Sequence, residues 1–435
     1  MDELETKTFS FVKVGSENSM KAEIISIGDE LLIGQTINTN ASWLGQELSL
    51  VGIPVKKCLT ISDDEGSILQ AIEEVVSTAD LVIITGGLGP TKDDITKHTL
   101  CKFFNTSLEI NEKVLKNVQD FFTSRGRKML DVNIQQAALP INCIILENTR
   151  GTAAGMWFEH NGVIVISLPG VPFEMKGIMK DEVFPRLKSI FTGDSIYHKT
   201  ILLQGIGESY LADRMKEWEQ SIHDQGFGLA YLPSVGALKL RITSPNGESD
   251  DEKIETYFTQ LTSELPQHVF GRGEETLSSV VGNLLIKQNK TIGTVESCTG
   301  GAIAEALTSV AGSSAYYQGS LLTYSNSLKE KLAEVRMADI QNFGAVSEEV
   351  VIQMAANGRK KLGVDVCIST SGVAGPDGGT NDKPVGTVWV GISTEKQTIG
   401  VKFLFSDNRE RNILMTVLSS INLVRCSLLG IANEN

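Results

Sequence analysis

Hydrophobic and polar positions along residues 20–172 fall into two kinds of block. Short runs rich in β-branched residues predict strands, and the stretches between them carry apolar residues at helical spacing. The strand patterns lie at 22–28, 53–62 and 80–87, and the helix patterns at 39–52 and 65–79. Strands that alternate with helices through short turns predict a mostly parallel sheet with helices on both faces. We therefore expect a three-layer α/β domain at 20–172, with its ligand site beyond the carboxyl ends of the strands.

Residues 173–272 follow a different pattern. A helix pattern leads to strands with alternating apolar positions, then to a second helix and a short strand. The helix patterns lie at 173–191 and 250–265, and the strand patterns at 199–206, 228–234 and 236–244. This order predicts a small α+β connector, and no catalytic cluster is visible in its sequence.

Residues 273–435 return to the alternation of helices and strands. Strand patterns recur at 291–297, 316–325, 365–375, 384–394 and 398–405. They predict a second α/β domain. Residues 1–19 are polar and unpatterned, so we expect a disordered extension there, with folding that starts at Met20. The chain is thus expected to be an α/β multidomain protein.

Composition narrows the class of partner. The 435 residues carry 39 basic and 53 acidic side chains, a net charge of −14, whereas nucleic-acid surfaces need clustered Lys and Arg. We therefore expect small phosphorylated ligands and no nucleic acid. The six cysteines show no C-x-x-C spacing, no apolar run reaches the ~18 residues of a spanning helix, and no signal peptide is visible. These features predict a cytoplasmic protein with reduced thiols and no membrane partner.

The segment 291–301 carries the strongest chemical signal. Its strand pattern stops at Glu296 and a helix pattern follows Gly301, so Ser297 and Cys298 lie on a strand-to-helix turn. Backbone N–H groups at such a turn favour a developing oxyanion. The turn therefore suits a nucleophile, although a serine in this position also commonly caps a helix. Cys298 itself is expected to be a small buried residue.

An activating base is the second requirement. No histidine follows His268, so a lysine whose pKa is lowered by burial is the leading candidate. Lys329 follows a predicted strand and could return to the strand-end pocket, although helical lysines are more often solvated. Ser314 offers a second hydroxyl. Together these residues suggest hydrolysis of an amide, with the nucleophile open between Ser297 and Ser314.

Acidic residues gather at the predicted strand ends of the first domain. They are Asp29, Glu30, Asp63, Asp64, Asp93 and Asp94. Carboxylates with little cationic charge nearby favour a hard divalent cation, and the glycine turn at 85–91 could wrap a phosphate group. Acidic turns are also ordinary helix caps, which is the alternative interpretation for Asp63 and Asp64.

The domain predicted at 273–435 resembles a known family through several segments. ESCTGG, AGSSAYYQGSLLTYSNSLKEKL, GAVSEEVV, SGVAGPDGG and KPVGTVWVG stand in the order found in the C-terminal domain of the CinA family. The resemblance covers about residues 275–430. It implies a serine amidohydrolase with a Ser/Lys dyad that converts the carboxamide of nicotinamide mononucleotide to nicotinate mononucleotide and ammonia without a cofactor.

Carried over to this chain, the resemblance favours Ser297 as the nucleophile and Lys329 as the base. Ser314 stays the alternative nucleophile, and Tyr324 is expected to complete the pocket. The other residues expected to bind substrate are Glu296, Thr299, Gly300, Gly301, Gly375 and Arg409. Gly300 and Gly301 would supply backbone amides.

Arg409 is the expected partner of the nucleotide phosphate. The family often has a second basic residue a few positions later. Asn412 and Ile413 stand there in this chain, so Arg411 is the expected substitute.

The first domain resembles the molybdopterin-binding fold of MoaB, MogA and MoeA, and more closely the N-terminal domain of CinA. The segments that carry this resemblance are GDELLIGQTINTNASWL, DLVIITGGLGPTKDDIT, NIQQAALP, GTAAGM and LPGVPFEM. The resemblance implies a metal-dependent pyrophosphatase that acts on ADP-ribose, with a divalent ion as cofactor and K⁺ as a further candidate. The family usually has GTAPG where this chain has GTAAG at 151–155, which relaxes that loop.

Residue roles follow from that resemblance and from the chemistry of each side chain. Asp93 and Asp94 would hold the metal or orient water, assisted by Asp29 and Glu30. The expected phosphate contacts are Gly86, Gly87 and Thr91, and the expected ribose or base contacts are Asn38 and Asn40.

We therefore predict a bifunctional cytoplasmic enzyme of pyridine-nucleotide metabolism, with small-molecule nucleotides as its ligands. Because the family is usually dimeric, the resemblance also implies a homodimer. Two alternatives remain open. One is a non-catalytic protein that binds a molybdopterin-type ligand, and the other is a regulator of DNA uptake or of the response to DNA damage.

Overall fold

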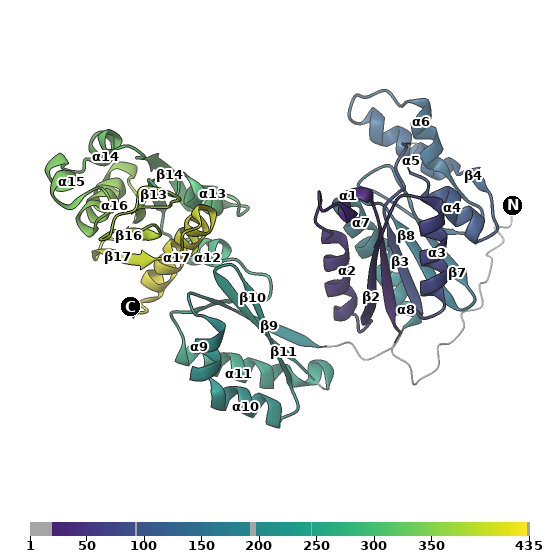
Figure 1. Ribbon diagram of the computed structural model, residues 1–435, viewed down its shortest axis with the longest axis horizontal. Coiled ribbons are helices and arrows are strands. Elements are labelled where there is room, and N and C mark those ends of the chain that lie inside the picture. Colours follow the sequence, from purple (N-terminus) through teal and green to yellow (C-terminus); the bar gives the residue numbers. More distant parts are fainter. Residues whose placement is uncertain (1–19, 92–93, 192–196, 245, 433–435) are drawn as a thin grey trace. The chain divides into compact units, whose positions relative to one another are not determined.

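The computed structural model describes residues 20–432, apart from 92–93, 192–196 and 245. The chain forms two compact units, which divide between residues 196 and 197, and each is described by itself (Figure 1). The expected extension at 1–19 and the predicted metal ligand Asp93 lie outside the described residues.

A six-stranded sheet forms the centre of the first unit. Its strand order is β2-β1-β3-β8-β7-β6, with parallel neighbours from β2 to β8 and antiparallel neighbours from β8 to β6. The strands are β1 (Ala22–Ile27), β2 (Val55–Ile61), β3 (Leu81–Thr85), β6 (Ile144–Leu146), β7 (Gly155–His160) and β8 (Val163–Leu168). The predicted mostly parallel sheet is confirmed, and the carboxyl ends of β1, β2 and β3 share one edge.

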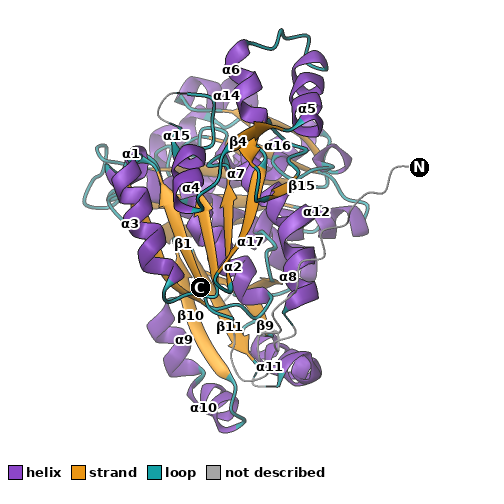
Figure 2. Ribbon diagram, turned by 90° about the vertical axis from the view of Figure 1, so that its right-hand side faces the viewer, coloured by secondary structure: helices purple, strands orange, loops and turns teal. Residues whose placement is uncertain are grey.

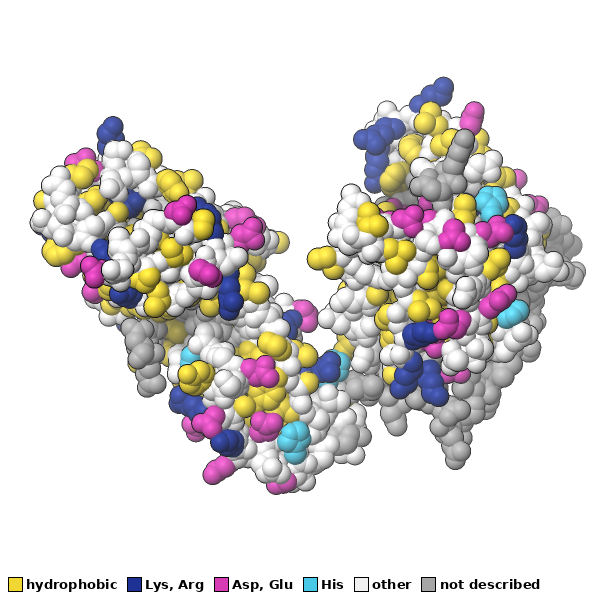
Figure 3. All heavy atoms as spheres, in the orientation of Figure 1, with side chains coloured by type: hydrophobic (Ala, Val, Ile, Leu, Met, Phe, Trp, Pro, Cys, Tyr) yellow, Lys and Arg dark blue, Asp and Glu magenta, His cyan; other side chains and the backbone are white. Residues whose placement is uncertain are grey.

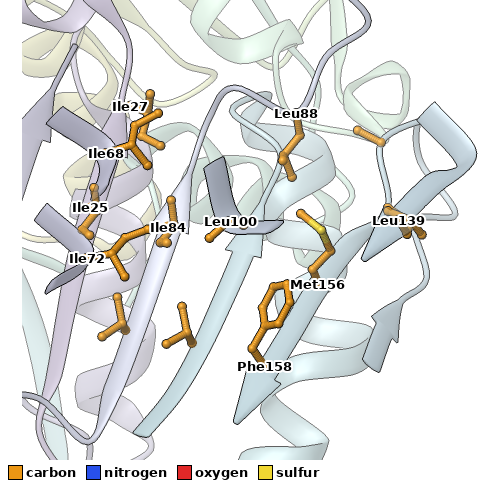
Figure 4. Close-up of a cluster of buried hydrophobic side chains, with 14 of the residues drawn as sticks. Ile25, Ile27, Ile68, Ile72, Ile84, Leu88, Leu100, Leu139, Met156 and Phe158 are labelled. Atoms are coloured by element: carbon orange, nitrogen blue, oxygen red, sulfur yellow. The ribbon is translucent and has the colours of Figure 1, made fainter. Parts of the chain in front are cut away.

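Alternate side chains of β1, β3 and β8 face two separate cores. On β1, Ile25 and Ile27 pack with Ile68 and Ile72, while Ile24 joins the opposite cluster (Figure 4). This alternation is the two-residue period of a strand buried on both faces. One face is covered by α3 (Glu65–Val76), α4 (Thr96–Phe103) and α5 (Glu112–Thr123), and the other by α2 (Thr39–Leu50), α7 (Pro172–Ile178) and α8 (Phe184–Ile190). Shorter elements are α1 (Asp29–Leu32), α6 (Asp131–Ile134), β4 (Leu108–Ile110) and β5 (Ala138–Pro140).

Helices α7 and α8 belong to the first unit rather than to the connector. Met175, Ile178 and Leu187 are buried in the core on the α2 face of the sheet. The structure therefore places the end of the first domain at residue 196, later than the expected 172. The apolar stripe in the sequence predicts the helices correctly, but it carries no information about which sheet they cover.

The second unit begins with a four-stranded antiparallel sheet, here called the antiparallel module (residues 198–272). Its strand order is β10-β11-β9-β12, and its helices pack on one face of that sheet (Figure 2). The elements in chain order are β9 (His198–Gln204), α9 (Glu208–Arg214), α10 (Lys216–Asp224), β10 (Gly228–Ser234), β11 (Ala237–Thr243), α11 (Asp251–Glu264) and β12 (Val269–Arg272). The strands expected at 199–206, 228–234 and 236–244 are all present.

The C-terminal module (residues 273–432) is built on a five-stranded sheet of order β14-β13-β15-β16-β17. The strands are β13 (Ile292–Glu296), β14 (Tyr317–Leu322), β15 (Val366–Gly372), β16 (Thr387–Ser393) and β17 (Thr398–Leu404). Strands β14, β13 and β15 run parallel to one another. Strands β16 and β17 add an antiparallel hairpin beside β15. The expected second α/β domain is confirmed.

Helices cover both faces of this sheet. One face packs on α16 (Glu348–Leu362), and the other on α12 (Leu277–Lys287), α13 (Ala302–Thr308) and α17 (Arg409–Leu429). The shorter helices α14 (Asn326–Ala333) and α15 (Met337–Phe343) follow β14. The carboxyl ends of β13, β14 and β15 meet at one edge, where the candidate chemistry lies.

Helix α17 is long and apolar enough to cross a membrane by length and composition. It nevertheless packs in the core of the C-terminal module, where Ile421 and Val424 are buried. It also carries the buried guanidinium of Arg425, which donates to backbone carbonyls. These contacts are those of a core helix.

Candidate active site

The turn between β13 and α13 folds as the sequence predicts. Gly300 and Gly301 have φ values of +61° and +104°, a backbone conformation that favours glycine. The backbone N–H of Ser297 donates to the carbonyl of Thr370 on β15 over 3.1 Å. The turn is therefore held to the sheet, with the Ser297 side chain at the carboxyl end of β13.

Glu296 has a different role from the one expected. Its buried carboxylate accepts hydrogen bonds from the N–H groups of Gly301, Ile303 and Ala304 at 2.9–3.1 Å, and from the Thr294 hydroxyl at 3.1 Å. It does not line the pocket described below. The structure thus corrects the expectation of a substrate contact, because this carboxylate caps α13.

The capping also changes which amides face the substrate. The N–H of Gly301 bonds to Glu296, and the N–H of Gly300 bonds to the carbonyl of Ser297. Neither of these N–H groups is therefore free to donate to the substrate as was expected. The N–H groups of Cys298 and Thr299 donate to no other residue among those that the structure describes. These two amides replace the glycine amides as candidate oxyanion donors.

Lys329 reaches the nucleophile. Its Nζ lies 2.9 Å from Oγ of Ser297 and donates to the backbone carbonyls of Thr323 at 2.9 Å and Tyr324 at 3.3 Å. The residue is only 2% exposed, while Lys331, two positions on, is exposed. Ser325 caps α14, and the fourth residue after this cap points back to the sheet.

Burial lowers the pKa of the Lys329 ammonium below its ordinary value. In the part of the chain that the structure describes, no carboxylate pairs with this ammonium, and its hydrogen-bond partners are carbonyl and hydroxyl oxygens. A neutral amine can accept a proton from Ser297. The Cys298 thiol has the opposite tendency, because burial raises its pKa to about 11 and keeps it protonated.

A pocket of about 180 Å³ opens beside this pair. It is lined by Ser297, Cys298, Tyr324, Asn326, Lys329, Ala345, Val346, Ser371, Gly372, Ala374 and Arg409. Four predicted residues therefore meet, since Ser297, Lys329, Tyr324 and Arg409 all face one space. Tyr324 is 67% exposed and Arg409 is also exposed, so both lie toward the solvent side.

The remaining predicted residues lie elsewhere. Ser314 is exposed in the short turn Ser313–Ala315, does not line the pocket and makes no contact with Lys329. Thr299 is buried and bonds to the hydroxyl of Thr370 at 2.8 Å. Gly375 accepts a hydrogen bond from Arg409 at 2.8 Å through its carbonyl and thereby orients the guanidinium. The chain distance between Ser314 and Lys329 could not reveal that the intervening strand separates them.

Sequence reasoning did not single out several pocket residues. Asn326 begins α14, and the hydroxyl of Ser371 donates to the carbonyl of Ala345 at 2.7 Å, which joins the end of β15 to the α15–α16 loop at the pocket wall. Ala345 and Ser371 belong to the motifs GAVSEEVV and SGVAGPDGG. Those motifs were the available signal, but they do not show which of their members face the ligand.

In the first unit, the predicted phosphate turn is tightly built. The N–H of Gly86 donates to the carbonyl of Leu168, and a Cβ on Gly86 would lie 2.3 Å from the carbonyl oxygen of Ile27. A Cβ on Gly87 would lie 2.0 Å from the hydroxyl of Thr96. Only glycine fits at these two positions.

The predicted polar ligands of the first unit mostly have local partners. Asn38 caps α2 by accepting from the N–H of Ala41 at 3.0 Å, and the Asn40 amide donates to the carbonyl of Gly170 at 2.7 Å. Asp94 accepts from the N–H groups of Gly89 and Thr91 at 2.8 and 2.9 Å, so it closes the loop. Thr91 donates its hydroxyl to Asp94 as well.

Several of the predicted carboxylates lie near one another. The N–H of Asp29 donates to Asp63 at 3.1 Å, and burial, together with the charges of Glu30, Asp29 and Asp94, raises the pKa of Asp63. Asp64 caps α3 instead. Among the residues that the structure describes, no group of three or more His, Cys, Asp or Glu is arranged to hold a metal ion. Asp93 lies outside these residues.

Two comparisons with known proteins decide the family. The chain is 48% identical to a CinA-like protein from Cytophaga hutchinsonii over 94% of its own length and 98% of that protein. It is 42% identical to a CinA-like protein from Flavobacterium psychrophilum over 93% and 98% of the two chains. The chain belongs to the CinA family.

Three family models match successive parts of this CinA-family chain. They are the probable molybdopterin binding domain at 23–189, the damage-inducible protein CinA KH domain at 198–271, and the CinA C-terminal domain at 274–428. A crystal structure of the protein CinA from Thermoplasma acidophilum, of unknown function, is similar with 34% identity and a TM-score of 0.36, and covers 40% of this chain and 99% of that one. The family and the α/β multidomain fold predicted from the sequence are confirmed.

Proposed function

We propose that this CinA-family protein is an amidohydrolase that converts the carboxamide of nicotinamide mononucleotide to nicotinate mononucleotide and ammonia in pyridine-nucleotide salvage. The observation that carries the proposal is the 2.9 Å contact between the buried Nζ of Lys329 and Oγ of Ser297 at the end of β13. A nucleophilic serine needs a base within hydrogen-bond reach, and a buried lysine without a carboxylate partner can serve as that base.

The first half of the reaction forms an ester. Oγ of Ser297 bonds to the carboxamide carbon while its proton passes to the neutral amine of Lys329, and the carbonyl electrons move onto oxygen. The N–H groups of Cys298 and Thr299 are the candidate donors to that oxyanion. The C–N bond then breaks, and the Lys329 ammonium returns the proton to the leaving nitrogen, which departs as ammonia.

The second half releases the acid. Neutral Lys329 takes a proton from water as the water oxygen bonds to the ester carbon. The C–O bond to Ser297 then breaks, and the proton returns to Oγ. While Lys329 is charged, the carbonyls of Thr323 and Tyr324 stabilise its ammonium.

The pocket supports a small amide with an anionic tail. Its volume of about 180 Å³ suits the reacting end of the substrate rather than a whole nucleotide, since complete ligand pockets are usually about 300–1,000 Å³. Arg409 at the solvent side is the only arginine or lysine besides Lys329 among the described pocket-lining residues, and we assign the phosphate to it.

Ammonia release from nicotinamide mononucleotide tests the proposal. We expect Ser297→Ala and Lys329→Ala each to lose about 10²-fold or more in kcat. Ser314→Ala is the matched control and should retain full activity, because its hydroxyl is exposed and outside the pocket. Full activity in the Ser297 and Lys329 variants would end the dyad hypothesis, and it would favour a binding or regulatory role in competence or DNA damage.

For the first unit we propose a second activity on ADP-ribose, at the glycine turn. The supporting observation is two separate buried oxygens without a hydrogen-bond partner in the described structure, Oδ1 of Asn40 beside Gly170 and Oγ1 of Thr96 beside Gly87. Buried polar atoms are normally paired, so these two suit the hydroxyl groups of a ribose.

Turnover of ADP-ribose by chelator-treated protein, before and after addition of Mg²⁺, Mn²⁺ or K⁺, tests this second activity and its predicted cofactor together. Asp63→Asn is expected to lower the rate, whereas exposed Asp120→Asn should not. If no condition gives turnover while ADP-ribose still binds, the first unit is a ligand-binding domain.

A further inference from the structure

A second cavity of the second unit lies away from Ser297. It measures about 480 Å³ and is lined by the β9–α9 connection and the β10–β11 hairpin of the antiparallel module, and by the β17 region and α17 of the C-terminal module. Its described lining shares no residue with the Ser297 pocket. A volume of this size falls within the range of small-molecule sites, about 300–1,000 Å³.

The walls of this junction cavity are fixed by hydrogen bonds between the two modules. The side chain of Gln204 donates to the hydroxyl of Ser419 at 3.3 Å, and Asn422 donates to the carbonyl of Gln267 at 3.0 Å. Arg425, which is 3% exposed, donates to the carbonyls of Pro266 and Gln267 at 3.0 and 2.8 Å. Because these contacts hold the modules together around the space, the cavity is preformed.

One wall of the cavity is aromatic and apolar. Phe403 and Phe405 both line it, and their rings stack with centroids 5.5 Å apart and planes 10° apart. Both rings are only partly buried. Such a surface favours contact with a planar ring system.

The guanidinium of Arg411 lies beside that wall. Arg411 lines the cavity and is exposed, and within the described residues its guanidinium forms no ion pair and no hydrogen bond. Its position also corrects a sequence-based expectation, since Arg411 lies here and not in the Ser297 pocket. The carboxylate of Glu208 lines the same cavity and disfavours an excess of negative charge.

We propose that the junction cavity is a second small-molecule site, which takes a nucleoside monophosphate with its base against Phe403 and Phe405 and its phosphate on Arg411. The aromatic apolar wall favours contact with the base, and the fork of guanidinium donors suits a phosphate. One arginine opposed by Glu208 matches one phosphate group rather than a triphosphate or a nucleic-acid backbone. The site is independent of the proposed amidohydrolase activity, because it contains neither Ser297 nor Lys329.

Calorimetric titration of the full chain with AMP tests the site, with adenosine and inorganic phosphate as the partial probes. We expect AMP to bind at least tenfold more tightly than either partial probe. Arg411→Ala should weaken AMP binding at least tenfold, and Arg411→Lys should restore part of it. The matched control is Lys402→Ala, which removes an exposed cation from the same β17 region that does not line the cavity, and it should leave binding unchanged.

Three results would overturn the proposal. One is the absence of AMP binding to the wild-type chain. Another is equal AMP affinity in wild type and Arg411→Ala, which would assign the observed binding to another part of the molecule. The third is equal affinity for adenosine and AMP, which would remove the phosphate contact. A circular-dichroism spectrum that matches wild type establishes that each variant is folded.

Discussion

At the scale of single residues, the proposed chemistry depends on how one amine is buried. Lys329 has three oxygen neighbours within hydrogen-bond distance, two of them backbone carbonyls. A carboxylate in that position would hold the lysine charged, whereas carbonyl oxygens leave the pKa lowered by burial. The sequence shows Lys329 and the missing histidines, but the burial of the amine is visible only in the fold.

The lowered pKa gives a prediction for the rate of ammonia release. Only the neutral amine accepts the proton of Ser297, so kcat/KM should rise with pH and level off above the folded-state pKa, which is below the ordinary 10.5 of lysine. Initial rates between pH ~6 and ~10 measure this rise of kcat/KM with pH. A rate that stays flat or falls across that range would contradict the role of Lys329 as the base.

The same shift predicts how stability depends on pH. The folded state binds fewer protons than the unfolded state between the lowered folded-state pKa and 10.5, so this lysine makes stability rise with pH in that window. Lys329→Met should remove that rise, because methionine has no group that titrates. Urea unfolding of both proteins at several pH values gives the difference, and identical pH dependence in the two would refute the prediction.

At the scale of elements, the β13–α13 turn shows what a local pattern does and does not specify. The strand, the glycine turn and the helix follow directly from the sequence. The role of Glu296 does not, because a carboxylate beside a serine looks the same whether it binds substrate or caps a helix. Three-dimensional contacts with Gly301, Ile303 and Ala304 decide for the cap. The sequence is equally ambiguous about the role of Ser314, which the fold places outside the pocket that contains Lys329.

Glu296→Gln should destabilise the C-terminal module by about 1–3 kcal/mol, because a neutral amide accepts fewer and weaker hydrogen bonds from the helix N-terminus. Glu305→Gln, an exposed residue in the first turn of the same helix, is the control and should cost less than about 1 kcal/mol. Denaturant unfolding measures both. Equal small effects would mean that the cap contributes little to stability.

At the scale of the whole molecule, the alternation of strands and helices was enough to predict two α/β domains and an α+β segment between them. It did not place the first boundary, because the helices at 173–191 pack on the first sheet through Met175, Ile178 and Leu187. Nor did it reveal α17 as a core helix that joins two modules. The sheet on which a helix packs depends on contacts between residues far apart in the sequence, and the spacing of apolar residues within the helix does not specify them.

Arg425 gives a test of that joining role. Arg425→Met should leave the carbonyls of Pro266 and Gln267 short of donors and cost about 1–3 kcal/mol. We also expect faster proteolytic cleavage between residues 265 and 277, where the two modules meet. Lys402→Met, at an exposed position, serves as the control. Unchanged stability and cleavage would show that the modules are held together by other contacts.

The absence of a nucleic-acid partner remains a prediction, and the match to a KH domain makes it worth testing. KH modules clamp a nucleic-acid backbone with a G-x-x-G loop, and residues 198–271 contain no G-x-x-G sequence. Over the face of the second unit in Figure 3, basic and acidic side chains are interspersed. Fluorescence anisotropy with labelled single-stranded RNA and DNA should show no binding at physiological salt, and salt-sensitive binding would contradict this.

The carbonyl oxygens around Lys329 have an evolutionary consequence. Main-chain atoms persist when a side chain is replaced, so the two carbonyl contacts of the amine depend on the path of β14 and α14 rather than on the side chains of residues 323 and 324. Natural selection on the reacting pair therefore acts on the identity of Ser297 and Lys329 themselves. A laboratory library randomised at position 329 should therefore yield almost no working variants.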